Sequence, residues 1–418
     1  MSKDTLSTEP YKGVRDFYPE DEFIQEYLFE AMKTACEKFG FEAYGASVME
    51  PSELYRSKNS DEIVNEQTYT FVDRGEREVT LRPEMTPTVA RMVAGKRHDL
   101  TFPLRWYSIP NCFRYERPQR GRVRDFWQLN ADIFGAPGIE AEAEIIALAH
   151  AVMIEMGATE NDFEIRINDR RMLTELFKGA DLTDEQTKNV MQLLDRKSKI
   201  DDFDAKLFEL VSSNQATHLL DGFAKAASSA HLESLRSLLY SMGVGNVTVD
   251  TSIVRGFDYY TGVVFEVFDT APENRRSLFG GGRYDNLTEL FGGEPITGIG
   301  FGMGDVTARD FLESHDLLPN YRPATELMLC PMDATSLKHA LTLAQELRHK
   351  DVAVSVNLSG KKIGDQIKQA DKMSIPFIIG VGERERDSGM YTLKQLSNGT
   401  EHTLSAEHIA DHLFSALG

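Results

Sequence analysis

Five arginines gather within about a dozen residues of a chain whose formal net charge is −20. They are Arg114, Arg117, Arg120, Arg122 and Arg124, in the stretch FRYERPQRGRVRDFWQ. A guanidinium group offers a planar fork of donors that matches a phosphate or a carboxylate, and it keeps its charge at every working pH. A solvated surface would mix both signs of charge. The cluster therefore favours an anion-binding segment over its alternative, a surface loop crossed by salt bridges.

Other polar side chains stand in three short segments, LRPEMT, IVRGFDYYTGVVFEVF and FGGGRYDNL. The glycine run of the last segment is not a Walker phosphate loop, and by itself it is typical of a tight turn. The three cysteines lie far apart without a CxxC pair, which argues against a disulfide framework and a cysteine-rich zinc site. The sequence predicts no resident metal site.

The elements that must position these residues are visible as periodic patterns. An apolar pattern with helical spacing begins at Asp21 and ends near Gly40, and a second one ends at Gly157. Residues 171–245 are helix-rich and polar, which indicates an inserted helical module. Strand-like runs cover residues 69–72, 78–81 and 105–113.

Strand character returns in TSIVRGFDYYTGVVFEVFD, where the pair Thr261–Gly262 predicts a hairpin turn between two strands. A connector that contains prolines, LLPNYRPATE, then marks a domain boundary. From residue 324 onward, strands and helices alternate, which is typical of a small α/β domain.

The length and composition suit a protein of two or three domains. The chain has 418 residues, whereas single cores stop growing at roughly 250 to 300. Hydrophobic residues make up 41%, and no run approaches the roughly 18 apolar residues that would span a bilayer. The N-terminal MSKDTLSTEP is polar and has no apolar signal region. We therefore expect a cytoplasmic protein without a membrane partner.

The motifs occur in the order and spacing of one family. LRPEMT, FRYERPQRGRVRDFWQ, IVRGFDYYTGVVFEVF and FGGGRYDNL together resemble the histidyl-tRNA synthetases of class II. YKGVRDFYPED resembles that family's N-terminal signature, and FGFEAYGASVMEPSELY resembles motif 1, with Pro51 as its proline. FRYERPQRGR resembles motif 2, and RGFDYYTG is similar to the histidine-specific motif. SGKKIGDQIKQADKMSIPFIIGVGERE is similar to the shared anticodon-binding domain, so the resemblance covers nearly the whole chain.

The resemblance implies an α+β fold: an antiparallel class II sheet flanked by helices, a helical insertion and a C-terminal α/β anticodon-binding domain. Residues 1–170 would form the first part of the catalytic domain and residues 171–245 the insertion. Residues 246–320 would supply the second part, with the histidine-specific motif and motif 3, and residues 324–418 the anticodon-binding domain. Motif 1 builds a dimer interface in this family, so a homodimer is implied.

The resemblance also implies a reaction in two steps. A histidine–tRNA ligase activates L-histidine with ATP, which gives histidyl-adenylate and pyrophosphate, and then transfers histidine to the 3' end of tRNA(His). The attacking carboxylate is already anionic, so the site needs no general base. It must position the reactants in line and stabilise phosphoryl charge. Mg²⁺ would accompany ATP as substrate, and no tightly bound cofactor is implied.

Two arginines are the expected catalytic residues. By resemblance, Arg114 holds the α-phosphate, and Glu116 helps to fix the adenine or the motif 2 loop. Arg255 would lie near the substrate carboxylate and the α-phosphate. Both arginines would therefore contact ATP and histidine.

The resemblance assigns the histidine pocket to residues from three segments. These are Glu84, Met85, Thr86, Gln128, Asp132, Tyr259 and Tyr260, with Arg114 and Arg255. Because neighbouring residues of a strand point to opposite faces, we expect only one of the two tyrosines to face the ligand fully, and Tyr260 is the preferred one. Tyr284 is a weaker candidate.

The remaining motif 2 residues would contact RNA. By resemblance, Arg117, Gln119, Arg120 and Arg122 meet the acceptor end of the tRNA, so the arginine cluster serves two polyanions. The C-terminal domain would read single-stranded anticodon bases by stacking and edge contacts.

Three positions depart from the family's pattern. Met85 stands where glycine is usual, and Asp132 stands where glutamate is usual. Motif 3 usually ends Gly-x-Gly-x-x-Arg, with the arginine on the ATP γ-phosphate, whereas Thr307 occupies that place here. If a helix begins at Asp305, Arg309 points about 200° away from position 307, since each helical residue turns about 100°.

The third departure leaves an alternative function open. A catalytically silent, synthetase-like regulatory subunit would sense histidine in histidine biosynthesis. Such proteins generally lack the anticodon-binding domain and erode the histidine-specific motif. Both features are present here, so the sequence favours the ligase.

Overall fold

The computed structural model describes most of the chain. The described residues are 6–56, 67–119, 121–195, 197, 200–226, 229–253, 259–272, 274 and 276–417. The chain divides into two compact units: Met1–Tyr18 with Ile24–Pro319, and Pro19–Phe23 with Asn320–Gly418. Two predicted site residues, Arg120 and Arg255, lie outside the described residues.

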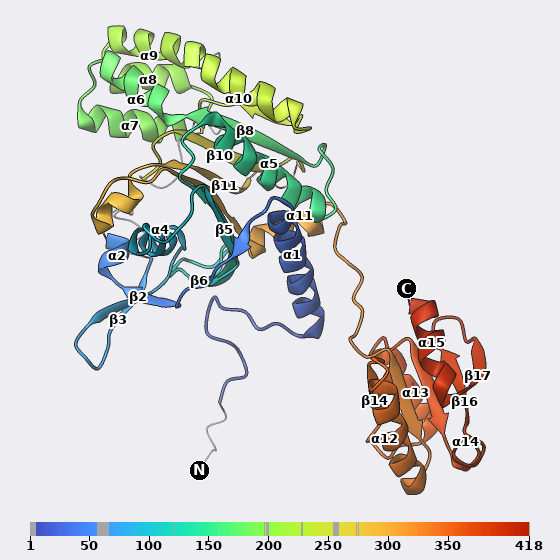
Figure 1. Ribbon diagram of the computed structural model, residues 1–418. Coiled ribbons are helices and arrows are strands. Elements are labelled where there is room, and N and C mark those ends of the chain that lie inside the picture. Colours follow the sequence, from blue (N-terminus) through green and yellow to red (C-terminus); the bar gives the residue numbers. More distant parts are fainter. Residues whose placement is uncertain are drawn as a thin grey trace. The chain divides into compact units, whose positions relative to one another are not determined.

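The larger unit is built on a mostly antiparallel sheet (Figure 1). Its path in the described part of the chain is β1-β5-β7-β12-β11-β10-β8-β9, and β6 pairs with β7. The pairs β1–β5 and β8–β9 are parallel. The strands are β1 (Glu42–Ala43), β5 (Leu104–Ser108), β6 (Asn111–Phe113), β7 (Asp125–Phe134), β8 (Phe163–Asp169), β9 (Val247–Val249), β10 (Val263–Asp269), β11 (Ser277–Tyr284) and β12 (Gly298–Gly304).

Helices cover this sheet and extend beyond it. Figure 1 shows α6 to α9 gathered at the top of the view, and their apolar side chains form a cluster separate from the central core. The helices are α1 (Pro19–Lys38), α2 (Glu53–Arg56), α4 (Thr86–Gly95), α5 (Ile139–Glu155), α6 (Arg170–Gly179), α7 (Asp184–Asp195), α8 (Phe203–Leu210), α9 (Ser213–Ala226), α10 (Ala230–Ser241), the 3₁₀ helix η2 (Leu287–Phe291) and α11 (Asp305–Ser314).

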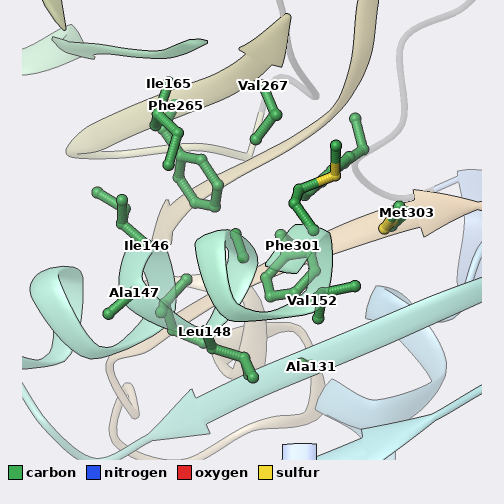
Figure 2. Close-up of a cluster of buried hydrophobic side chains, with 14 of the residues drawn as sticks. Ala131, Ile146, Ala147, Leu148, Val152, Ile165, Phe265, Val267, Phe301 and Met303 are labelled. Carbon is green, nitrogen blue, oxygen red and sulfur yellow. The ribbon is translucent and has the colours of Figure 1, made fainter. Parts of the chain in front are cut away.

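The central core lies between the sheet and α5. Figure 2 shows Ile146 and Val152 of α5 beside Phe265, Phe301 and Met303 of the strands, and all five side chains are buried. Removing this apolar surface from water is the main stabilising contribution to such a layer. One face of the sheet is therefore occupied by the apolar core.

Strand alternation leaves the opposite face for polar groups. On β7, Ala131 and Ile133 belong to the core, whereas Asn130 and Asp132 line a cavity. Successive side chains of a strand point to opposite faces. The sequence QLNADIF thus serves the core and a polar site with alternate residues.

A small antiparallel sheet, in the order β2-β4-β3, completes the larger unit. It consists of β2 (Met49–Pro51), β3 (Tyr69–Val72) and β4 (Glu78–Leu81). The bounds of β3 and β4 are those that the sequence predicts. Pro51, the predicted motif 1 proline, ends β2.

The smaller unit has its own sheet, in the order β14-β13-β15-β16-β17, and its own apolar core. The three strands β14, β13 and β15 are parallel, and β16 and β17 add antiparallel pairs. Its elements are β13 (Leu327–Pro331), α12 (Ala334–Arg348), β14 (Val354–Val356), α13 (Ile363–Lys372), β15 (Phe377–Val381), α14 (Glu383–Ser388), β16 (Met390–Gln395), β17 (Glu401–Ser405) and α15 (Ala406–Leu417).

The predicted α+β class, with an antiparallel sheet flanked by helices and a separate C-terminal α/β domain, is confirmed. Three local predictions are wrong. The run 105–113 is divided into β5 and β6, which are separated at Ile109–Pro110. The hairpin at Thr261–Gly262 does not form, because residues 259–262 lie outside any strand and the Thr261 backbone N–H donates to Arg283 O at 2.7 Å. The glycine run is no tight turn, since it forms the centre of β11.

Candidate functional site

A polar cavity of about 50 Å³ lies on the face of the sheet opposite the core. One ordered water needs roughly 10–15 Å³ on this measure, so the cavity has room for several atoms of a ligand. Strands β7, β11 and β12 form its floor, and two segments outside the strands form its walls. Its lining residues are Glu84, Thr86, Gln128, Asn130, Asp132, Tyr259, Tyr260, Gly280, Tyr284, Gly300, Phe301 and Gly302.

Glycines make the floor flat enough for polar side chains to lie across it. Gly300 of β12 is paired with Asp132 of β7. A Cβ atom at Gly300 would lie 2.0 Å from Asp132 Oδ1, and one at Gly302 would lie 2.6 Å from Gln128 Nε2. Real Cβ atoms do not approach other atoms so closely. The absence of side chains at Gly300 and Gly302 is therefore what allows Asp132 and Gln128 to occupy this face.

Asp132 is a buried carboxyl group in which one oxygen accepts a hydrogen bond and the other could still accept one from a ligand. The Tyr284 hydroxyl donates to Asp132 Oδ1, and Oδ2 accepts no hydrogen bond from the described residues. Burial raises the pKa of Asp132 to about 7, an effect that the hydrogen bond from Tyr284 partly offsets. Burial also raises the pKa of Tyr284 well above its ordinary range, so this hydroxyl stays protonated and donates.

A second buried carboxyl group, Glu84, stands at the start of α4. The Tyr259 hydroxyl donates to Glu84 Oε2 at 3.0 Å, and Glu84 is 2% exposed. Thr86 is the first residue of α4 and also lines the cavity. Met85, between them, is fully buried, but its side chain is not among those that line the cavity. Its predicted contact with histidine stays a prediction.

Arg114 lies beside this wall of the cavity. Its Nε donates to the carbonyl of Pro83 at 2.9 Å, next to Glu84 in the chain. Its guanidinium group also lies over the ring of Phe126, 5.2 Å from the ring centre. These contacts orient a cation without neutralising it, because neither partner is an anion.

The motif 2 loop, residues 114–124, has exposed polar side chains near its tip and less exposed ones at its base in the part that the structure describes. Gln119 and Arg122 exchange backbone hydrogen bonds of 3.1 and 2.9 Å, which closes the tip of the loop. Arg117, Gln119 and Arg122 are exposed, whereas Glu116 is half-buried and lies 3.4 Å from Arg122 Nη1. The arginines of the loop that the structure describes thus divide into exposed ones and the anchored Arg114 and Arg124.

Comparison with known proteins decides the family. A family model described as histidyl-tRNA synthetase matches residues 13–305, and one described as an anticodon binding domain matches residues 326–414. A histidine–tRNA ligase from Leptospira biflexa is 42% identical over 423 residues, which cover 97% of each chain. The chain belongs to the histidyl-tRNA synthetase family.

Solved structures show the same fold. The histidyl-tRNA synthetase from Nostoc sp. PCC 7120 superposes with a TM-score of 0.83 at 23% identity, over 99% of this chain and all of the other. A protein described as an ATP phosphoribosyltransferase regulatory subunit/histidyl-tRNA synthetase, from Bacillus halodurans, gives a TM-score of 0.73 at 22% identity over 90% of this chain. At these identities the likeness concerns the fold alone. None of the helices in the described ranges is long and apolar enough to cross a membrane.

The two tyrosines of the histidine-specific motif both line the cavity. That only one of them, preferably Tyr260, faces the ligand fully stays a prediction. That prediction assumed a strand with alternating faces. Tyr259 and Tyr260 precede β10 without strand pairing, so alternation does not apply. Their rings meet edge to face, 5.1 Å apart.

The motif 3 position where the histidyl-tRNA synthetase family usually has arginine is structural in this chain. Helix α11 begins at Asp305, and Thr307 Oγ1 donates to the carbonyls of Leu278 and Gly304 at 2.8 and 3.1 Å. Arg309 donates from Nε to Glu313 Oε1 at 3.2 Å, one turn further along the helix. Thr307 therefore ties the helix to β11, and no phosphate-binding role follows from its contacts.

Several residues that line this cavity were missed or given little weight in the predictions from the sequence. Asn130 lies between Gln128 and Asp132 at strand spacing, so alternation along QLNAD could have found it. Tyr284 was ranked as a weak candidate, although its hydroxyl holds Asp132. The floor glycines were missed because their role depends on β7, which is distant in the sequence.

Proposed function

We propose that the chain is a histidine–tRNA ligase, which forms histidyl-adenylate and pyrophosphate from L-histidine and ATP and then transfers histidine to tRNA(His). The observation that carries the proposal is the cavity with two buried carboxyl groups, Glu84 and Asp132, each oriented by a tyrosine hydroxyl. An α-ammonium group and an imidazole N–H are the donors such a cavity suits. Arg114 lies at its edge to meet the carboxylate and the α-phosphate.

We assign the roles in activation as follows. Glu84, Thr86, Gln128, Asp132, Tyr259 and Tyr260 bind histidine, with Met85 behind them. Arg114 and Arg255 stabilise the charge that develops on the α-phosphate, and Glu116 helps to fix the adenine or the loop. Buried donors and fixed cations act strongly on such charge because little water screens them.

The second step requires RNA contacts. We assign the acceptor end of the tRNA to Arg117, Gln119, Arg120 and Arg122, because those of them that are described are exposed on one loop. The domain of residues 324–418 would bind the anticodon. Residues 1–170 and 246–320 would form the catalytic domain around an insertion of residues 171–245.

The remaining properties follow those expected for the family. We propose that Mg²⁺ enters with ATP as part of the substrate and that the protein holds no tightly bound cofactor. It would act in the cytoplasm as a homodimer, with motif 1 at the interface.

The decisive test is ATP–pyrophosphate exchange with each of the twenty amino acids in turn. We expect exchange with histidine alone and a loss of about a hundredfold or more in an Arg255→Ala variant, since one donor to developing charge often contributes that much. Exchange that depends on another amino acid would overturn the assignment.

Thr307 in place of the usual arginine is the one observation that favours a second candidate, a regulatory subunit that senses histidine. The same experiment separates the two. Histidine binding by calorimetry without exchange would support the regulatory function.

A further inference from the structure

The fifth arginine of the motif 2 cluster, Arg124, has no place in the roles assigned above. It is 9% exposed, whereas Arg117 and Arg122 are exposed. A buried guanidinium group needs partners for its donors, because leaving them unmet costs free energy. Its contacts therefore indicate what it does.

Arg124 joins the two sides of the loop base to a third segment. Its Nε donates to the Glu116 carbonyl at 3.1 Å, and its Nη1 donates to the Lys12 carbonyl at 3.1 Å and to the Tyr11 hydroxyl at 3.3 Å. Its backbone N–H donates to Gly13 O at 2.7 Å, and its carbonyl accepts from the Arg114 N–H at 3.0 Å. A shift of Arg124 would thus move both Arg114 and Glu116.

Aromatic rings hold the same guanidinium group. Its carbon lies 4.1 Å from the ring centre of Tyr115 and 5.7 Å from that of Tyr11. The Tyr115 ring in turn meets Tyr69 edge to face at 5.5 Å. A planar, weakly hydrated guanidinium stacks on aromatic faces in a way that a lysine ammonium cannot reproduce.

Gly13 allows the close approach. Its φ is +88°, and a Cβ atom there would lie 2.8 Å from Pro118 Cγ and 2.9 Å from Arg124 Cδ. Both the backbone angle and the space thus require glycine at this position.

The N-terminal segment is fixed at its other end as well. Arg15 Nη2 donates to Asp125 O at 3.1 Å and to Asp305 Oδ2 at 2.9 Å. Asp305 is 1% exposed, and it also accepts from Gln25 Nε2 and from the Trp127 backbone N–H. Residues 11–15 therefore run from the base of the motif 2 loop to the start of α11.

We infer that residues 11–15, the N-terminal strap, hold the base of the motif 2 loop through Arg124, which makes Arg124 a positioning residue for the ATP site. The inference rests on the proposed function, since it concerns how Arg114 and Glu116 are presented to ATP. Arg124 acts through these two residues, because it is buried and its Nε and Nη1 already donate to protein groups. The strap is thus part of the activation site although it contributes no substrate contact.

The test is ATP–pyrophosphate exchange with the full chain and the variants Arg124→Lys, Gly13→Ala and their combination. Lysine keeps the charge but loses the stacking and the forked hydrogen bonds. We expect the KM for ATP to rise about tenfold in each single variant, since hydrogen bonds from a charged group are lost or displaced. The KM for histidine should stay within about twofold. The double variant should be no worse than the more affected single variant, because both changes break one contact.

Arg236→Lys serves as the control, because Arg236 is an exposed arginine paired with Glu233 on α10 and should behave as the unsubstituted chain. An unchanged KM for ATP in Arg124→Lys or in Gly13→Ala would overturn the inference. So would equal rises of both KM values, which indicate a general loss of structure. If Gly13→Ala does not fold, Tyr11→Phe replaces it, with a smaller rise in the KM for ATP expected.

Failure of the proposed function is a separate outcome, because the unsubstituted chain would then show no exchange with histidine. In that case trypsin cleavage after Arg122 reports on the loop. Faster cleavage in Arg124→Lys at an unchanged melting temperature would support the strap, and an unchanged rate would overturn it.

Discussion

The carboxyl group of Asp132 titrates near neutral pH inside the proposed histidine pocket. Its pKa of about 7, raised from an ordinary 3.8 by burial, means that the folded chain holds a proton there that the unfolded chain has already released at pH 5 or 6. This group therefore lowers stability progressively as the pH rises from about 4 to about 7. Above pH 7 its full cost is present.

An Asp132→Asn variant should remove this dependence. We expect the free energy of unfolding of the variant, relative to the unsubstituted chain, to rise by up to about 3 kcal/mol between pH 4.5 and pH 8, at about 1.4 kcal/mol per pKa unit. Urea unfolding of both proteins at several pH values measures the difference. A difference that does not change with pH would contradict a raised pKa.

Tyr284→Phe should weaken histidine binding selectively. It leaves the buried Asp132 carboxyl group without its hydroxyl donor, and a lost hydrogen bond to a charged group costs about 1.5 kcal/mol or more. We expect the KM for histidine in the exchange reaction to rise about tenfold and the KM for ATP to stay unchanged. Tyr240→Phe, at an exposed tyrosine of α10, is the matched control. Equal effects on both KM values would argue against a role in the histidine pocket.

At the scale of elements, the flat floor of β12 is the feature most sensitive to added atoms. A methyl group at Gly300 meets Asp132 Oδ1 and the Ala131 carbonyl. We therefore expect Gly300→Ala to abolish histidine-dependent exchange, because the carboxyl group must leave its position. Gly95→Ala is the control, since Gly95 ends α4 with open space around it. Full activity of Gly300→Ala would show that Asp132 is not held against this strand.

Elements with strong local signals could be predicted from the sequence. Helices α1 and α5 end close to Gly40 and Gly157, whose φ angles of +75° and +92° suit a residue without a side chain. Strands β3 and β4 have the predicted bounds. These helix ends and strand bounds depend on residues that are neighbours in the chain. A short sequence pattern is therefore enough to predict them.

The parts of the site that were missed depend on pairing between distant segments. The need for glycine at Gly300 comes from Asp132 on a neighbouring strand, and no local pattern encodes that register. The strand expected at Tyr259 and Tyr260 is absent for a related reason: tertiary contacts hold these residues outside a strand despite their high strand propensity. The resemblance to the family named both tyrosines as site residues, but it did not predict how their rings are arranged.

At the scale of the whole molecule, two cores should respond separately to damage. Leu343 of α12 is buried in the core of the smaller unit, and Leu148 of α5 in that of the larger one. A buried Leu→Ala change costs about 2–5 kcal/mol. We expect calorimetry to show two unfolding transitions. Leu343→Ala should lower the midpoint temperature of one transition, and Leu148→Ala should lower that of the other. A single transition that both variants lower equally would contradict two independent cores.

The glycine floor also limits how the choice of amino acid could be altered. Three positions on the floor of the cavity, Gly280, Gly300 and Gly302, already carry the smallest residue, so a substitution there can only reduce the depth of the cavity. A variant that accepts a bulkier amino acid must gain its room from the tyrosine wall. Altering the polarity of the accepted side chain instead means replacing Asp132 together with Tyr284, because the Tyr284 hydroxyl donates to Asp132. Substitutions that change the accepted amino acid must therefore be made in the walls of the cavity, because the floor cannot be made deeper.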